Sequence, residues 1–264
     1  MPVNRWRAIA DDLRGRIELG EWAPGDQLPP HRDLMERYTT TSQATIARAM
    51  AALTAEGLLV SDPRAPRRGV YVRSSSLVRR DLVAGLRMEH QRAVADDDGG
   101  GRGLFEAATG VAPGSLDVSV TYATATADAS SAAALGIAQG DPVLRRTFRY
   151  TIEGTPHQVV CSYMSLASAN AAGLVDASSE RPGQGTIAHL RKAGIHVDRV
   201  DIEMQARIPS PAEAADLAVP PGVPVFSHQR TMHADGRPVE TSTAVVAGDR
   251  VAYTLNVDLT EGSE

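Results

Sequence analysis

The sequence predicts an α+β protein with two domains, a small helical one followed by a larger one that mixes strands and helices. Three observations predict this. Apolar residues first recur at helical spacing, the chain then becomes rich in Ser, Asp and Gly, and apolar and polar residues later alternate as in strands. We expect the small domain over residues 1–75, a flexible linker over 76–103 and the larger domain over 104–264.

The first domain is expected to begin with three helices. Trp6, Ile9, Leu13 and Ile17 lie at spacings of three and four residues and form the apolar face of the first helix. The second helix is expected after Pro29-Pro30, since proline is tolerated at the first helical positions. The third is expected to begin at the N-cap Ser42 and to end near Gly57.

Two short strands complete this domain. They are expected at 58–60 and 70–72, and the turn over 61–69 carries three arginines. The order helix, helix, turn, helix and paired strands is that of a winged helix-turn-helix, whose third helix enters the DNA major groove. The alternative for the arginine-rich turn by itself is a solvated loop.

The charge distribution agrees with this interpretation. The whole chain has a net charge of −5, which alone does not favour nucleic acid as a partner. Residues 1–80 contain 13 arginines and 9 acidic residues, a net charge of +4, whereas residues 81–264 have a net charge of −9. Basic charge therefore collects in the predicted DNA-binding domain.

Residues 5–73 resemble the GntR family of bacterial transcription factors. The segments that carry the resemblance are 8–14, 24–29, 32–38, 52–59 and 68–72. The resemblance implies that Arg32, early in the second helix, contacts DNA. Gln43 and Ala47 stand where the family usually has arginines, so the base preference is expected to differ, since Gln pairs with adenine and Arg with guanine. The turn 39–41 is also one residue longer than usual.

The predicted DNA-binding residues are Arg32, Ser42, Gln43, Ala44, Thr45, Arg48, Arg67, Arg68 and Gly69. Arg67 and Arg68, in the turn between the strands, are expected to reach the DNA backbone or the minor groove. The alternative for Arg48 is a surface salt bridge.

The linker prediction depends on Asp96-Asp97-Asp98 and the three glycines that follow, because such a sequence cannot bury a core. A short amphipathic piece over 77–94 precedes it. A metal site at the three aspartates is the alternative, which is disfavoured because consecutive side chains point in different directions.

The larger domain is expected to form one antiparallel sheet with flanking helices. Strands are predicted at 116–122, 143–151, 157–166, 197–207, 225–233, 238–246 and 250–259, and helices at 128–135, 186–191 and 211–218. Its halves repeat each other: 135–144 matches 217–226, and each segment leads to a hairpin with a Gly-x-Pro turn.

Residues 104–260 resemble the UTRA ligand-sensing domain, most strongly at 140–146 and 234–240. A UTRA domain after a GntR domain is the architecture of the HutC subgroup. The resemblance implies a chorismate-lyase-like fold with a pocket for a small-molecule effector.

The predicted effector-binding residues are Arg146, Phe148, Tyr150, Ser162, Thr186 and Glu240. Relatives that bind phosphosugars place two arginines where this chain has Phe148 and Tyr150, which favours a less charged or larger ligand. Thr186, at a helix N-terminus, is a candidate anion contact. The alternatives are core packing for the two aromatic residues and entry of Arg149 if the strand register shifts by one.

No catalytic motif, metal-ligand spacing or cofactor loop is found in the sequence, so no enzyme, metal or cofactor is predicted. Cys161, the single cysteine, lies in an apolar strand and is expected to be inert. Without a signal peptide or an apolar span, a cytoplasmic protein with no membrane partner is expected.

Together these patterns predict a homodimeric, ligand-responsive transcriptional regulator that binds double-stranded operator DNA, and that acts as a repressor released by its effector. One alternative is a constitutive regulator of the plasmid or mobile-element type with a degenerate sensor. A minor alternative is residual lyase-like enzyme activity.

Overall fold

The structure, a computed structural model, describes residues 5–40, 42–61, 69–73, 77–97, 103–180, 184–219 and 222–256. The chain divides into two compact units. The first contains the residues up to Ser76 together with 208–224, and the second contains 77–207 and the residues from Val225 onward. Each unit is described by itself.

The first unit contains the predicted helices and the wing hairpin. Its elements are α1 (Arg5–Glu18), α2 (His31–Arg37), α3 (Gln43–Ala55), β1 (Leu59–Ser61), β2 (Val70–Val72) and, from the later segment, α9 (Pro211–Asp216). Ser42 is the N-cap of α3, as predicted, since its side chain accepts a hydrogen bond from the Thr45 amide at 3.3 Å. The strands β1 and β2 pair antiparallel, with Leu59 opposite Val72.

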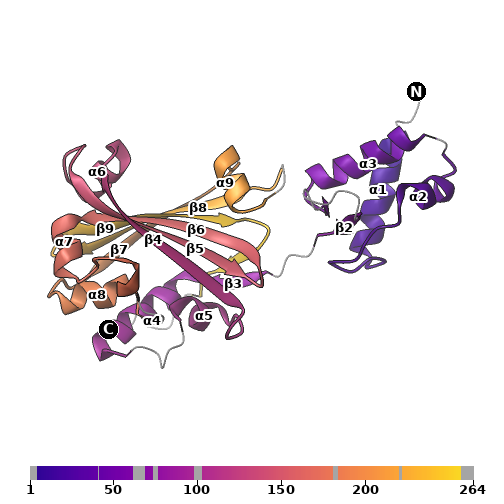
Figure 1. The fold of residues 1–264 in the computed structure, drawn as a ribbon. Helices are drawn as coiled ribbons and strands as arrows, with labels where there is room; N and C mark the ends of the chain where they lie inside the picture. The colour runs from indigo at the N-terminus through magenta and orange to yellow at the C-terminus, as the bar shows by residue number, and fades with distance from the viewer. Residues whose placement is uncertain are drawn as a thin grey trace, which may run out of the picture. The chain divides into compact units, whose positions relative to one another are not determined.

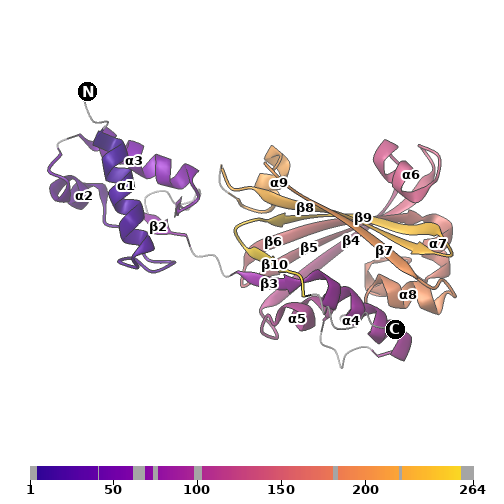
Figure 2. The ribbon, with the colours of Figure 1, turned by 180° about the vertical axis from the view of Figure 1, so that it is seen from behind.

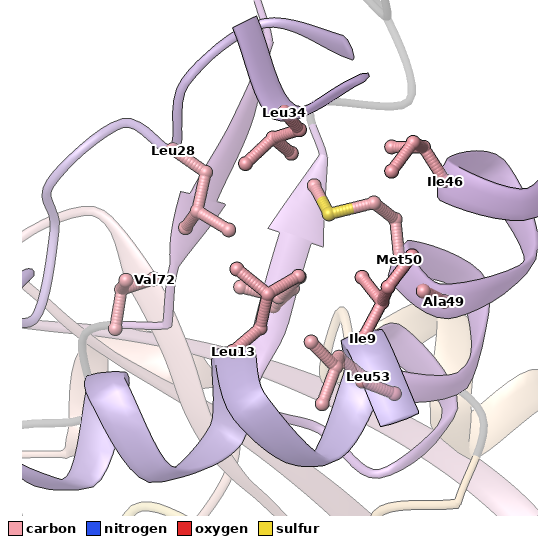
Figure 3. Packing of buried hydrophobic residues seen from close by; sticks show 11 residues of the cluster. Ile9, Leu13, Leu28, Leu34, Ile46, Ala49, Met50, Leu53 and Val72 are labelled. Atoms are coloured by element: carbon pink, nitrogen blue, oxygen red, sulfur yellow. The ribbon is translucent and has the colours of Figure 1, made fainter. Parts of the chain in front are cut away.

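The helices pack around one apolar core, in which side chains from all three helices and β2 point toward one another (Figure 3). Leu13 of α1, Leu34 of α2 and Leu53 of α3 are completely buried there. The predicted stripe on α1 splits by depth: Ile9 and Leu13 are buried, whereas Trp6 and Ile17 lie at the core's edge. This packing fixes α3 on the domain and leaves its N-terminal residues at the surface.

The second unit is built on a six-stranded antiparallel sheet in the order β4-β5-β6-β9-β8-β7. The strands are β4 (Leu116–Thr126), β5 (Pro142–Ile152), β6 (Thr155–Ser165), β7 (Arg199–Arg207), β8 (Val225–Ala234) and β9 (Arg237–Ala247). The two predicted hairpins, β5–β6 and β8–β9, meet at the sheet's centre, where Ser162 lies opposite Ser242. The predicted antiparallel sheet with flanking helices is therefore confirmed.

Helices cover one face of this sheet. The helices α4 (Leu82–Ala95), α5 (Leu104–Thr109) and α8 (Thr186–Lys192) lie along the same face in both views (Figures 1 and 2). The remaining short helices of the unit are α6 (Ala129–Leu135), α7 (Leu166–Ala171) and the 3-10 helix η3 (Ala177–Ser179).

The predicted flexible linker over 76–103 is wrong for most of its length. Strand β3 (Val78–Asp81) and helix α4 fill residues 78–95, and Asp81 is the N-cap of α4. The amphipathic pattern over 77–94 indicated the helix correctly, because the apolar side of α4 packs against the sheet domain. Ala93 is buried in the same core cluster as residues of α8. Residues 98–102 lie outside the described residues.

The last strand also differs from its prediction. The described strand β10 (Val251–Thr254) is shorter than the expected 250–259, and residues 257–264 lie outside the described residues. It pairs in parallel with β3, with Val251 opposite Val78. Two segments far apart in the sequence thus form a small second sheet, which periodicity within either segment does not reveal.

The depth of burial on α1 gives a stability prediction. Replacement of Leu13 by Ala is expected to lower the free energy of unfolding of the first domain by about 2–5 kcal/mol, because it leaves a cavity in a closed core. Leu19 follows the same helix but is 88% exposed, so Leu19→Ala is the matched control and should change stability by less than about 0.5 kcal/mol.

Urea unfolding followed by tryptophan fluorescence measures this difference, since both tryptophans, Trp6 and Trp22, lie in the first domain. Equal effects of the two substitutions would contradict the packing of α1.

Candidate functional sites: the surface of α3 and a cavity beside the sheet

The predicted DNA-binding residues on α2 and α3 lie at the surface. The Arg32 side chain is 84% exposed, and among the described residues it pairs with its neighbour Asp33 at 3.2 Å. Gln43 and Ala44 are exposed at the first turn of α3, and Thr45 is half-buried. These positions are accessible to a DNA groove.

Arg48 makes a cation–π contact instead of the salt bridge considered as its alternative. Its guanidinium lies 4.8 Å from the ring centroid of Trp6 on α1. This contact holds an exposed cation one turn beyond Ala44 on the surface of α3.

The wing is described only at its base. Arg67 and Arg68 lie outside the described residues. Gly69 has a positive φ of 112°, and a Cβ there would lie 2.1 Å from the Gln27 side-chain nitrogen. The structure therefore gives Gly69 a backbone role in the hairpin.

Three other arginines among the described residues of this domain are paired with acids. Arg14 donates to Glu56 and Asp11, and Arg37 donates to Glu21. Arg16 also bonds Glu21. Among the described residues, Arg32 and Arg48 are thus the cations of α2 and α3 best placed to meet phosphate or base edges.

The second unit contains a cavity of about 770 Å³ between the covered face of the sheet and the helices α4, α5 and α8. Its size is within the range of sites that enclose a small molecule. The residues that face it come from the following elements: Arg80 of β3, Glu89 of α4, Phe105 of α5, Val120 of β4, Phe148 and Tyr150 of β5, Ser162 of β6, His228 and Arg230 of β8, and Glu240 and Ala244 of β9.

Arg146 is buried directly behind this wall, with 1% of its side chain exposed. It donates from Nη1 to Glu180 at 2.9 Å and from Nη2 to Ser162, Thr186 and Glu240 at 2.9, 3.0 and 3.1 Å. Burial lowers the pKa of Arg146, but the carboxylates of Glu240 and Glu180 outweigh it, so its pKa is raised and it stays charged.

A second guanidinium joins this network from β8. Arg230 donates to Glu240 Oε2 at 3.2 Å, and its Nη1 lies 3.7 Å from Glu89 Oε2. Glu240 therefore bridges Arg146 and Arg230, and Ser162 donates a further hydrogen bond to its Oε1 at 2.7 Å. Burial raises the pKa of Glu89, and Arg230 partly offsets this rise.

The rest of the cavity wall is aromatic and apolar. The rings of Phe105 and Tyr150 lie 5.2 Å apart, and the guanidinium of Arg80 lies 5.1 Å from the Phe105 ring. Burial lowers the pKa of His228 to about 4, so this histidine is neutral at neutral pH. Phe148 lines the cavity, and the guanidinium of Arg146 lies 5.5 Å from the centroid of its ring.

The structure brings the predicted effector-binding residues together. Phe148, Tyr150, Ser162, Thr186 and Glu240 line the cavity. Arg146 lies directly behind the wall and bonds three of them.

The structure decides two expectations, the entry of Arg149 into the cavity and the anion contact at Thr186. Arg149 is exposed on the opposite face of β5, so the one-residue register shift that would bring it inward does not occur. At the helix N-terminus where Thr186 was expected to contact an anion, a carboxylate of this chain is already bound. Glu89 accepts the Ile187 N–H at 3.4 Å, and the Thr186 hydroxyl accepts from Arg146.

Several charged residues of the site were missed in the sequence. Glu89 was missed because its helix was assigned to a linker, although Leu82, Leu86 and Glu89 lie at helical spacing on the pattern over 77–94. Arg230 alternates with His228 and Met232 on a predicted strand, and this alternation was the available signal. No sequence pattern indicated Glu180, which follows η3.

Among the described residues, no group of three or more His, Cys, Asp or Glu side chains is arranged to hold a metal ion. None of the described helices combines the length and apolar character needed to cross a membrane.

A winged helix-turn-helix followed by a sheet domain with a cavity is the architecture of a DNA-binding protein with a separate ligand domain. Comparison with known families identifies the family to which the chain belongs. Residues 6–72 match the model of the gntR family of bacterial regulatory proteins, and residues 110–252 match the UTRA domain. The chain belongs to the GntR family, and its combination of domains fits the HutC subgroup.

The relatives agree with this family over nearly the whole chain. An uncharacterized HTH-type transcriptional regulator of Streptomyces coelicolor is 31% identical over 255 residues, which cover 96% of this chain and 92% of the relative. A crystal structure described as a GntR-family transcriptional regulator is 26% identical, with a TM-score of 0.58 over 97% of this chain and 98% of the other.

PhnF from Mycobacterium smegmatis has the same fold, with 20% identity and a TM-score of 0.51 over 96% of this chain and 100% of PhnF. The protein is therefore a transcriptional regulator with a DNA-binding GntR domain and a UTRA effector-binding domain.

The buried network gives a second stability prediction. Arg146→Met is expected to lower the free energy of unfolding of the sheet domain by about 3–5 kcal/mol, because it leaves Glu240 buried beside one guanidinium instead of two. The neighbouring Arg145 is exposed on the opposite face, so Arg145→Met is the matched control and should change stability by less than about 0.5 kcal/mol.

Calorimetry can measure both variants, with tryptophan fluorescence used to recognise the transition of the first domain. If Arg146→Met and Arg145→Met have the same free energy of unfolding, the network does not stabilise the sheet domain.

Proposed function

We propose that this protein is a homodimeric repressor that binds operator DNA and is released when a small molecule enters the UTRA cavity. The observation that carries the proposal is the composition of the cavity wall. Arg80 of β3 and Glu89 of α4 belong to the segments that follow the DNA-binding domain directly in the chain. An effector in this cavity would contact the segments through which the two domains are joined.

The proposed mechanism is a shift between two states of the dimer. Helix-turn-helix dimers read two half-sites about one helical turn apart, so the spacing of the two DNA-binding domains sets the affinity for the operator. An effector that favours one arrangement of β3 and α4 changes this spacing. It can shift the equilibrium only by the difference between its affinities for the two states.

A second candidate function is a constitutive DNA-binding regulator whose sensor no longer responds. The observation in its favour is that the guanidinium groups of Arg146 and Arg230 are already paired with glutamates of this chain. A small molecule retained by the purified protein, detected by mass spectrometry after denaturation, would count against this candidate.

Operator binding is tested by fluorescence anisotropy on a labelled fragment of the gene's own upstream region, titrated across salt concentrations. We expect tighter binding than to a scrambled fragment and a steep loss of affinity with salt, since phosphate contacts release counterions. Equal affinity for the two fragments would exclude simple autoregulation, and a genomic selection would then supply the operator.

With an operator in hand, Arg32→Ala is expected to weaken binding by about 1–3 kcal/mol, because it removes an exposed cation from the DNA-facing surface. Arg145→Ala makes the same change in net charge on an exposed strand of the other domain and is the matched control. The role proposed for Arg32 is refuted if both variants bind like the parent protein.

Gln43→Ala is expected to act on specificity more than on affinity for unrelated DNA. If Gln43 reads an adenine, its loss should reduce discrimination at one base pair of each half-site by about 1–3 kcal/mol. A binding assay on operators substituted one base pair at a time measures this. Gln229→Ala, on an exposed position of β8, is the control and should preserve the pattern of base preferences.

A further inference from the structure

The arginines at the cavity already have bonding partners within the protein. Arg146 makes four hydrogen bonds, and Arg230 is shared between Glu240 and Glu89. Arg80 donates to Gln158 at 2.7 Å and stacks on Phe105. An anionic ligand that bound Arg146 or Arg230 would therefore compete with a glutamate of this chain for the guanidinium, whereas Arg80 has an amide and an aromatic ring as partners.

Other sources of positive charge are absent from the described part of the wall. His228 is neutral, because burial lowers its pKa to about 4. The Ile187 N–H, in the first turn of α8, already donates to Glu89 Oε1. Few charged donors are left to a phosphate or carboxylate: among the described residues the Nε atoms of Arg146 and Arg230 have no partner, and Arg80 donates to a neutral amide. Burying an anion with incomplete pairing is costly.

Carboxylate oxygens, in contrast, remain available. Glu89 Oε2 makes no hydrogen bond among the described residues, and Arg230 approaches it only to 3.7 Å. Glu180 Oε1 accepts from both Arg146 and Tyr122, whereas its Oε2 has no partner among these residues. Both glutamates line the cavity.

The charge balance of the wall points the same way. The described part of the wall contains five carboxylates, those of Asp81, Glu89, Glu106, Glu180 and Glu240. It contains two guanidinium groups, those of Arg80 and Arg230, and Arg146 behind the wall adds a third. The surplus is two negative charges. It favours a ligand that brings positive charge.

The remaining wall fits a flat apolar group. Phe105, Phe148 and Tyr150 present aromatic surface, and Val120 and Val160 flank Phe148 on the two neighbouring strands. A cavity of about 770 Å³ has room for such a group beside a polar head.

From these observations we propose that the effector is an amine, a molecule with a cationic ammonium group on a flat apolar body, and that its ammonium group binds Glu89. This inference rests on the proposed function, because it names the ligand class of the same cavity. The ammonium group would donate to Glu89 Oε2 in a charge-assisted hydrogen bond, and the apolar body would lie against Phe105 and Phe148.

The test uses the full chain and three probes of matched shape: 2-phenylethylamine, 2-phenylethanol and phenylacetate. The corresponding indole compounds, tryptamine, tryptophol and indole-3-acetate, form a second and larger set. Dissociation constants are measured by ligand-observed NMR and calorimetry at neutral pH. In at least one set we expect the amine to bind about tenfold or more tighter than the carboxylate, with the alcohol between them.

Two variants locate the preference. Glu89→Gln keeps the shape of the side chain and removes its charge, so it should reduce the preference for amine over carboxylate to less than about threefold. Glu203→Gln makes the same change at an exposed position of β7, outside the cavity wall, and should leave the preference unchanged. Retained binding of the alcohol by Glu89→Gln shows that the cavity is still formed.

The ligand class is overturned if a carboxylate binds as tightly as its matched amine, if neither amine binds at millimolar concentration, or if Glu89→Gln keeps the full preference. Operator anisotropy on the same samples separates this result from the proposed function. An amine that binds without changing operator affinity supports the ligand class and contradicts the release mechanism. A carboxylate that releases the operator supports release and contradicts the ligand class.

Discussion

Arg146 places a permanent positive charge inside the sheet domain, and the surroundings of the cavity are organised by the need to neutralise it. A guanidinium buried to this extent is tolerated only with carboxylate partners and satisfied hydrogen bonds. The partners come from β6, β9, the N-terminus of α8 and the segment after η3. One charge thus connects elements that are distant in sequence, and it fixes α8 against the sheet.

The same requirement explains the chemistry of the cavity. Glu240 neutralises Arg146 and also holds Arg230, which in turn lies near Glu89 of α4. Arg146 and Arg230 thus have carboxylate partners within the fold, whereas Glu89 and Glu180 each present a carboxylate group to the cavity.

Much of the fold was predictable because its signals are local. The period of Ile9 and Leu13, the N-cap at Ser42 and the repeated Gly-x-Pro hairpins each act over a few residues, and the structure contains the elements that they predict. Strand alternation also placed Arg146, Phe148 and Tyr150 on one face of β5 correctly. The helix over 82–95 was misassigned because the Asp- and Gly-rich stretch beside it was given more weight than its amphipathic pattern.

By itself, therefore, the sequence determined the elements with strong local signals, the two-domain architecture of a GntR-type regulator and the positions on β5 that share the face toward the cavity. The tertiary structure alone decided which charges meet there. The partners of Arg146 lie 16, 34, 40 and 94 residues away, and Glu89 reaches the site only through the docking of α4 near α8. Pairing across a sheet and packing of a helix depend on register and three-dimensional distance, which the spacing of residues along one segment does not encode.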